Sequence, residues 1–354
     1  MPAAQSPYRM FIGTYTKEKS RGIYSLSLDG STGSLGAPQL AAEAPNPTFL
    51  AISPDRGLLY AVCAGPAWAS SYRMGRDRAS LTPIRQGIPG TGPTPCHISV
   101  DSTGTVALAA NYHLGLAAAI PLSRDGDLGA PRVVAHEGKG PHPTRQTASH
   151  VHSTYFTPDG RFALVCDLGL DRVFTYAIER GSVTLTPGSP PFVTAEAASG
   201  PRHLVFGKNG QQVYVINELG NTIVVYDFAA VNGGLTARQT VSVLPPGFQG
   251  ESTAAEVKVH PNGQFAYGSS RGSDTLAVFA VGPRDGRLSP VEFIPCGGKG
   301  PRSFGLSGDG RWLVCAHQDS GTVCSFGVDA QSGRLSRVPG TVAVSMPVCV
   351  LFAD

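Results

Sequence analysis

The sequence contains six copies of one short motif, in which an apolar strand-like segment is followed by a Pro-Asp-Gly-like turn and a second apolar segment. The mean spacing between the turns is about 51 residues, a period typical of the four-stranded blades of a β-propeller. Dividing the 354 residues by this period gives about seven copies, one more than the complete turns. The turn positions are Arg56, Gly104, Gly160, Gly210, Gly263 and Gly310.

The two ends of the chain explain the missing copy. Residues 346–352 (MPVCVLF) match the first strand of the motif, and residues 9–14 (RMFIGT) match the second. Residues 22–28 (GIYSLSL) are typical of a third strand. We therefore predict that the C-terminal strand completes the blade that the N-terminus begins, which closes the ring and protects its strand edges.

The composition agrees with an all-β chain. Glycine (44 residues) and proline (29 residues) separate short runs rich in Val, Leu, Phe and Tyr, as expected for many short strands joined by tight turns. No long segment has the 3.6-residue period of an amphipathic helix. A pair of β-sandwiches would not give six turns at nearly even spacing. The sequence thus predicts a single domain over residues 1–354, a seven-bladed β-propeller with four antiparallel strands in each blade.

Charge and hydropathy exclude several classes of partner. The formal net charge is only +3 and no Lys/Arg cluster occurs, so we expect no nucleic-acid partner. No apolar run approaches the ~20 residues of a membrane span, so we expect no membrane partner either. Residues 1–8 lack the pattern of a signal peptide, and the seven cysteines include no C-x-x-C pair. These features predict a cytoplasmic protein with free thiols.

The repeat also predicts which residues meet. The first strand of a blade runs one way and the second returns, so the loop before the first and the loop after the second lie at one end of the channel. Positions seven and eight residues before or after each turn fall at this end. Their residue types change from blade to blade, which indicates a shaped pocket of mixed charge. These positions hold the candidates His97, Asn111, His152, Asp167, Arg202, His203, Asn217, Glu218, Glu256, Arg271, Arg302, His317 and Gln318.

Structural roles are the alternative for several candidates. Asn111, Asp167 and Asn217 stand where a turn begins, and Asn and Asp favour turns for local hydrogen-bonding reasons. Charged side chains facing a narrow channel need a partner or a ligand, so a ring of ion pairs is the alternative to a binding site. His150 and His152 alternate on one strand, but no spacing fixes further metal ligands. We expect neither a metal nor a cofactor.

The motifs resemble the lactonase family of seven-bladed propellers, which includes bacterial propeller-type 6-phosphogluconolactonases and fungal carboxymuconate cyclases. The resemblance runs from FIGTYT and GIYSLSLD through HVHSTYFTPDGRF and GPRHLVF to GPRSF and AHQDSGTV. In the cyclase branch a His, two Arg and a Glu are proposed to form the active site. The resemblance implies that the matching catalytic residues here are His152, Arg202, Glu218 and Arg271.

The resemblance implies hydrolysis of a sugar lactone, either 6-phosphoglucono-δ-lactone in the pentose phosphate route or a related aldonolactone. Glu218 or His152 would deprotonate the attacking water, and Arg202 or Arg271 would stabilise the oxyanion. Two alternatives are a cyclase-type isomerase and a non-enzymatic interaction propeller, for which Trp68 is the candidate exposed aromatic residue. The expected substrate-binding residues are His97, Asn111, His150, Asp167, His203, Asn217, Glu256, Arg302, His317 and Gln318.

Overall fold

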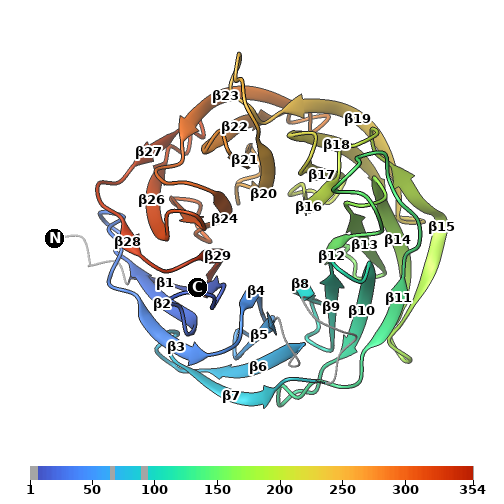
Figure 1. The fold of residues 1–354 in the computed structure, drawn as a ribbon, viewed down its shortest axis with the longest axis horizontal. Coiled ribbons are helices and arrows are strands. Elements are labelled where there is room, and N and C mark those ends of the chain that lie inside the picture. Colours follow the sequence, from blue (N-terminus) through green and yellow to red (C-terminus); the bar gives the residue numbers. More distant parts are fainter. Residues whose placement is uncertain (1–6, 64–67, 89–94, 354) are drawn as a thin grey trace.

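Seven antiparallel sheets stand as blades around a central channel in the computed structural model, which describes residues 7–63, 68–88 and 95–353 (Figure 1). Every sheet has four strands in radial order, and one sheet carries a short fifth strand, β28 (Val342–Ala343), paired with β26. The predicted seven-bladed propeller is confirmed. Within the described residues, no helix is long and apolar enough to cross a membrane.

Six blades follow one another along the chain, each built from the channel outward. The first three contain β4 (Pro47–Ile52), β5 (Leu58–Cys63), β6 (Ala69–Met74) and β7 (Leu81–Gln86); β8 (Pro95–Val100), β9 (Val106–Asn111), β10 (Leu116–Pro121) and β11 (Arg132–Ala135); and β12 (Val151–Phe156), β13 (Phe162–Asp167), β14 (Arg172–Glu179) and β15 (Thr184–Thr194). The next three contain β16 (Pro201–Phe206), β17 (Gln212–Asn217), β18 (Thr222–Ala229) and β19 (Gly234–Ser242); β20 (Thr253–Val259), β21 (Phe265–Arg271), β22 (Thr275–Val281) and β23 (Leu288–Pro295); and β24 (Pro301–Leu306), β25 (Trp312–His317), β26 (Thr322–Val328) and β27 (Leu335–Arg337).

The seventh blade joins the two ends of the chain. Its strands, from the channel outward, are β29 (Pro347–Phe352), β1 (Tyr8–Thr14), β2 (Gly22–Leu28) and β3 (Gln39–Glu43). β29 pairs antiparallel with β1, with Phe352 opposite Met10 and Val350 opposite Ile12. The predicted closure is therefore confirmed, and hydrogen bonds between β29 and β1 hold the ring together at this point.

In the six blades that follow one another along the chain, the turns between the two inner strands lie at one end of the channel. Their key position adopts a left-handed backbone, with φ of 65° at Gly160 and 76° at Gly310. Glycine adopts this conformation without steric cost. Arg56 occupies the same position with φ of 57°, so this turn is locally strained.

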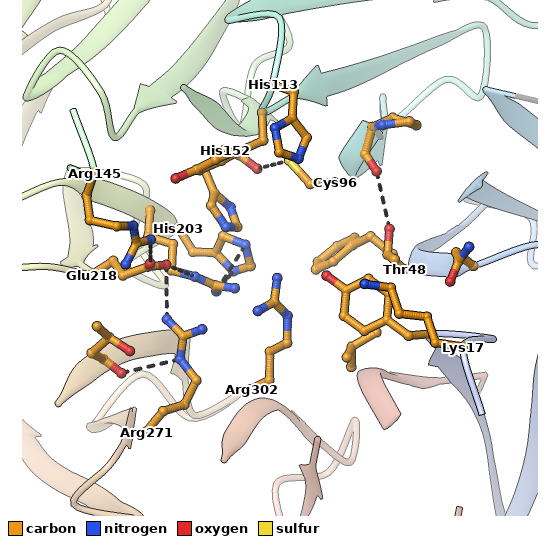
Figure 2. A pocket seen from close by; sticks show the side chains of 18 residues that line it. Lys17, Thr48, Cys96, His113, Arg145, His152, His203, Glu218, Arg271 and Arg302 are labelled. Atoms are coloured by element: carbon orange, nitrogen blue, oxygen red, sulfur yellow. Dashed lines mark hydrogen bonds and ion pairs between the residues drawn. The ribbon is translucent and has the colours of Figure 1, made fainter. Parts of the chain in front are cut away.

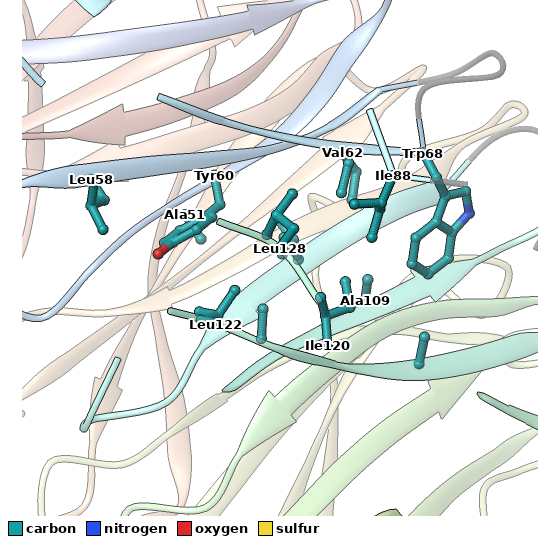
Figure 3. Close-up of a cluster of buried hydrophobic side chains, with 14 of the residues drawn as sticks. Ala51, Leu58, Tyr60, Val62, Trp68, Ile88, Ala109, Ile120, Leu122 and Leu128 are labelled. Atoms are coloured by element: carbon teal, nitrogen blue, oxygen red, sulfur yellow. The ribbon is translucent and has the colours of Figure 1, made fainter. Parts of the chain in front are cut away.

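The hydrophobic core is divided among the junctions between blades. Seven buried clusters occur among the described residues, one at each junction. Figure 3 shows the cluster between the blades that begin with β4 and β8, where Trp68 packs near Ile88 and Val62. Trp68 is fully buried, so the prediction that it is exposed on a rim is wrong. The residue directly precedes β6, and its ring enters the junction instead of the rim.

Candidate active site

Each inner strand carries a β-bulge near its first residue, at the end of the channel opposite the turns. The register of pairing with the second strand skips His152 in β12, Arg202 in β16 and Arg302 in β24. A bulged residue leaves the ladder and re-aims its side chain, and bulges recur at the rims of ring-shaped sheets. The bulges therefore direct these three side chains toward the channel.

The three side chains line a cavity of about 440 Å³ at this end of the channel (Figure 2). Its wall holds five cationic side chains and one carboxylate, a formal charge of +4 (five minus one) when histidines are counted as neutral. The volume suits a small sugar-sized ligand. The charged and imidazole residues of the wall are Lys17, Arg145, Arg202, Arg271, Arg302, Glu218, His113, His152 and His203.

Glu218 organises three of the arginines. Its Oε2 accepts hydrogen bonds from Arg202 Nε at 2.9 Å and lies 3.0 Å from the guanidinium of Arg271. Arg145 donates to its Oε1. Burial alone would raise the pKa of Glu218, but the guanidinium groups outweigh it and hold the pKa well below its usual range. Glu218 is thus a fixed anion that orients cations, and it is a weak proton acceptor.

Two buried histidines, His152 and His203, form another part of the wall. Their ring centroids lie 5.1 Å apart. His152 has an unpartnered Nδ1, and the Nδ1 of His203 lies 3.1 Å from Glu256 Oε1. Burial, reinforced by the nearby Arg202, lowers the pKa of both rings well below the ordinary value. Both imidazoles are therefore neutral at pH 7 and available to accept a proton.

Arg302 differs from the other buried cations of the site. Among the described residues, no carboxylate lies within ion-pair distance of its guanidinium, which lies 5.7 Å from the centre of the Tyr15 ring. Figure 2 shows the Arg302 side chain reaching into the space between Lys17 and Glu218 with its arginine partners. A partly buried cation without a counter-charge favours an anionic ligand.

The predicted residues fall into two groups. His152, Arg202, His203, Glu218, Arg271 and Arg302 line the cavity. The others lie outside its wall. His97 and Glu256 lie deeper in the channel, against His203. His150 stacks on Tyr112 with ring centroids 4.3 Å apart.

The remaining predicted residues form local hydrogen bonds after the second strand of their blades. Asp167 accepts from Ser149 Oγ at 2.6 Å and from the His150 amide at 2.9 Å. Asn217 donates to Thr222 Oγ1. Asn111 accepts from the Leu114 amide, and Gln318 donates to Asp319. The ring nitrogens of His317 lie 2.9 Å from the carbonyl oxygen of Cys296 and 3.1 Å from that of Thr322.

Sequence reasoning missed part of the wall. Tyr15 and Val348 belong to the closing blade, which has no turn from which to count. Aligning β29 and β1 with the inner strands of the other blades would have identified both residues. In this alignment Val348 corresponds to Arg202, and Tyr15 corresponds to Glu218. Arg145 lies in the loop between β11 and β12, outside the repeat, and no sequence signal identifies it.

The described residues contain no group of three or more His, Cys, Asp or Glu side chains placed to hold a metal ion. Cys96 lines the cavity, but burial raises the pKa of its thiol to about 12, so it is no nucleophile at neutral pH. The positive charge of this site comes from guanidinium and ammonium groups.

Comparison with known proteins identifies the family. The family described as "Lactonase, 7-bladed beta-propeller" matches residues 9–352. The 6-phosphogluconolactonase of Bacillus subtilis (strain 168) is 36% identical over 348 residues, which are 98% of each chain. The structure of the periplasmic gluconolactonase of Pseudomonas aeruginosa is similar with a TM-score of 0.93, at 34% identity over 99% of each chain. A crystal structure of a protein from Lactobacillus plantarum gives a TM-score of 0.92, at 32% identity over 99% of this chain and 100% of that one. The chain therefore belongs to the lactonase family of seven-bladed β-propellers.

Proposed function

We propose that the protein hydrolyses an anionic sugar lactone, with 6-phosphoglucono-δ-lactone as the first choice and a related aldonolactone as the second. The cavity supports this proposal, because five cations face one carboxylate and Arg302 has no carboxylate partner among the described residues. Family membership supports the reaction class, since the relatives above are named a 6-phosphogluconolactonase and a gluconolactonase.

In the proposed mechanism, water adds to the carbonyl carbon of the lactone and the carbonyl oxygen gains negative charge. The guanidinium groups of Arg202 and Arg271 stabilise this oxyanion, because fixed cations in a buried site need no reorganisation during the reaction. A base takes one proton from the water and returns it to the ring oxygen when the C–O bond breaks. The products are a hydroxyl group and a carboxylic acid, which ionises.

We assign the base to His152 rather than Glu218. Both carboxylate oxygens of Glu218 are engaged by arginines, so a proton arriving there would have to displace a guanidinium group. His152 lines the same cavity as a neutral imidazole with an unpartnered Nδ1. Glu218 then acts by holding Arg202 and Arg271 in place.

The proposal is tested by comparing a phosphorylated lactone with its unphosphorylated counterpart. We assign Arg302 to the phosphate, so Arg302→Gln should lower kcat/KM for 6-phosphoglucono-δ-lactone about 10- to 100-fold, the range expected for one lost charged hydrogen bond. The value for glucono-δ-lactone should change little. The exposed Arg161→Gln, at the opposite end, is the matched control.

Two results would contradict this prediction at different levels. Equal losses of kcat/KM for the two lactones would show that Arg302 does not bind the phosphate. A wild-type protein that hydrolyses neither substrate, nor any other sugar lactone in a small panel, would overturn the proposed function itself.

Chelation provides an independent test. Because guanidinium groups supply the proposed electrostatic stabilisation, we expect lactone hydrolysis to proceed at an unchanged rate after treatment with EDTA. The measurement is kcat before and after dialysis against the chelator. Loss of turnover that one divalent ion restores would replace the arginine-based mechanism with a metal-assisted one.

We also propose that the protein works in the cytoplasm. All seven cysteines are free thiols, and each is buried or half-buried. Unpaired cysteines are typical of reducing compartments.

A further inference from the structure

A second cavity, of about 350 Å³, opens at the turn end of the same channel. Phe49 lines both cavities, so only a thin layer of side chains separates them. Within this layer the rings of Phe49, His97 and His203 are in mutual contact, with centroid distances of 4.2, 5.4 and 5.6 Å. The layer forms the floor of the first cavity.

A chain of polar contacts crosses this floor. His203 lines the first cavity, and its Nδ1 lies 3.1 Å from Glu256 Oε1. Glu256 lines the second cavity, and the same oxygen lies 3.3 Å from Lys258 Nζ. The Glu256 side chain is 1% exposed, whereas that of Lys258 is 33% exposed. The chain thus runs from the buried site to a solvent-accessible group at the other end.

We propose that His203 and Glu256, with Lys258 holding the Glu256 carboxylate in place, form a proton outlet, which carries the proton released by each hydrolysis to the far end of the channel. The inference rests on the proposed lactonase function. Hydrolysis of a lactone at neutral pH yields a carboxylate and one proton. The product acid gives this proton to His203, the resulting imidazolium gives a proton to Glu256, and Glu256 releases it to water in the second cavity. No other reactant is needed.

Electrostatics favour this direction. The first cavity has a formal charge of +4. A proton leaving through the mouth would pass three cations, Lys17, Arg145 and Arg302, whereas the floor offers the Glu256 carboxylate with one cation, Lys258, beside it. Like charges near a narrow path repel, so the cations direct the proton toward Glu256.

The groups that face His203 also fit a relay. Guanidinium NH1 of Arg202 lies 3.5 and 3.4 Å from the two ring nitrogens, so it sits over the ring face and leaves the in-plane positions available. Arg302 and Lys258 are the other nearby cations, Glu218 and Glu256 are the carboxylates, and His97 and His152 are the neighbouring rings. Burial and then Arg202 lower the pKa of His203, so the ring passes a proton on instead of retaining it.

An unpartnered polar atom in the floor adds independent support. His97 Nε2 is buried without a hydrogen-bond partner, and the ring centroid of His97 lies 5.4 Å from that of His203. Buried polar groups are normally satisfied, commonly by ordered water. The floor therefore holds an imidazole nitrogen that is available for hydrogen bonding next to His203.

The test replaces the carboxylate with a group of the same shape that cannot carry a proton. Glu256→Gln should lower kcat at least about tenfold in 1 mM buffer held at constant pH by titration, with little change in KM, since acid–base steps are worth ~10²–10⁴-fold. In Glu256→Ala, whose shortened side chain leaves space beside His203, formate should restore kcat. Wild-type kcat should not depend on buffer or formate. The matched control Asp101→Asn removes another buried, ion-paired carboxylate at the turn end and should leave kcat independent of buffer.

Each outcome decides the proposal. A folded Glu256→Gln protein with wild-type kcat in 1 mM buffer would overturn it, and so would a loss of kcat in Glu256→Ala that neither buffer nor formate restores. If these variants do not fold, Lys258→Met, at a partly exposed site, should show a smaller loss of the same buffer-dependent kind. A Lys258→Met protein with the wild-type kcat in 1 mM buffer would again contradict the proposed proton outlet. Absence of lactone hydrolysis by the wild type would instead contradict the proposed function.

Discussion

Replacing His152 with glutamine is expected to lower kcat for lactone hydrolysis by about 10²–10⁴-fold, the usual contribution of general-base assistance. Glutamine keeps the polarity and much of the volume of the side chain, so KM and the melting temperature should change little. Steady-state kinetics and a thermal melt measure both effects. His260→Gln, at a buried histidine near the turn end of β20, is the matched control, and its folded fraction should keep the wild-type kcat.

The pH profile checks the same assignment. A base must be deprotonated to act, and burial lowers the pKa of His152 well below 6.5. The neutral, active form is therefore present throughout the neutral range, and kcat should fall only when the pH drops through this lowered pKa. If Glu218→Gln lost kcat while His152→Gln retained it, the two roles would have to be exchanged.

Deleting the last strand should have the largest effect on folding. A chain that ends at Ser345 lacks β29, which supplies an inner strand and buries Cys349 and Val350 at two blade junctions. It would also expose a strand edge of β1 and open the ring. We expect insoluble protein or loss of the cooperative thermal transition. A truncated chain with a wild-type melt would contradict the role of β29 in closing the ring.

A circular permutant supplies the control for this deletion. Phe352 lies opposite Met10, just as Phe156 lies opposite Ala163 across a Pro-Asp-Gly turn in another blade. A turn of this type should therefore connect β29 to β1, with new ends between the exposed Ala330 and Gln331. The permutant keeps every strand and should fold. If it failed as the truncation does, chain continuity rather than the presence of β29 would explain the truncation.

The fold could be predicted from the sequence because a propeller repeats one short-range signal. Each turn is specified by a few residues, such as Pro158 to Gly160, and the even spacing of six such turns leaves few alternative architectures. Closure followed because two terminal segments matched consecutive strands of the same motif. Trp68 was misplaced because composition does not show whether a residue next to a strand faces the rim or the adjoining blade.

The site was predicted less completely, for a reason that lies in the bulges. Counting from the turns gives the correct end of the channel, but it does not show which of two neighbouring positions turns inward. Arg202 lies at a bulge and faces the cavity, whereas Asn217 lies beyond the end of a strand and bonds to its own turn. Arg145 comes from a loop that the repeat does not position, and its contact with Glu218 could not be predicted.

The floor made by Phe49, His97 and His203 determines how substrate and product enter and leave the cavity. Protons can cross such a layer, but a sugar acid cannot, so the substrate arrives and the product departs by the same mouth. Ring opening gives the ligand one more negative charge, and the arginines that attract the lactone therefore retain the acid more strongly. For a lactonase built in this way, we expect accumulated product to compete with fresh substrate for the same opening of the cavity.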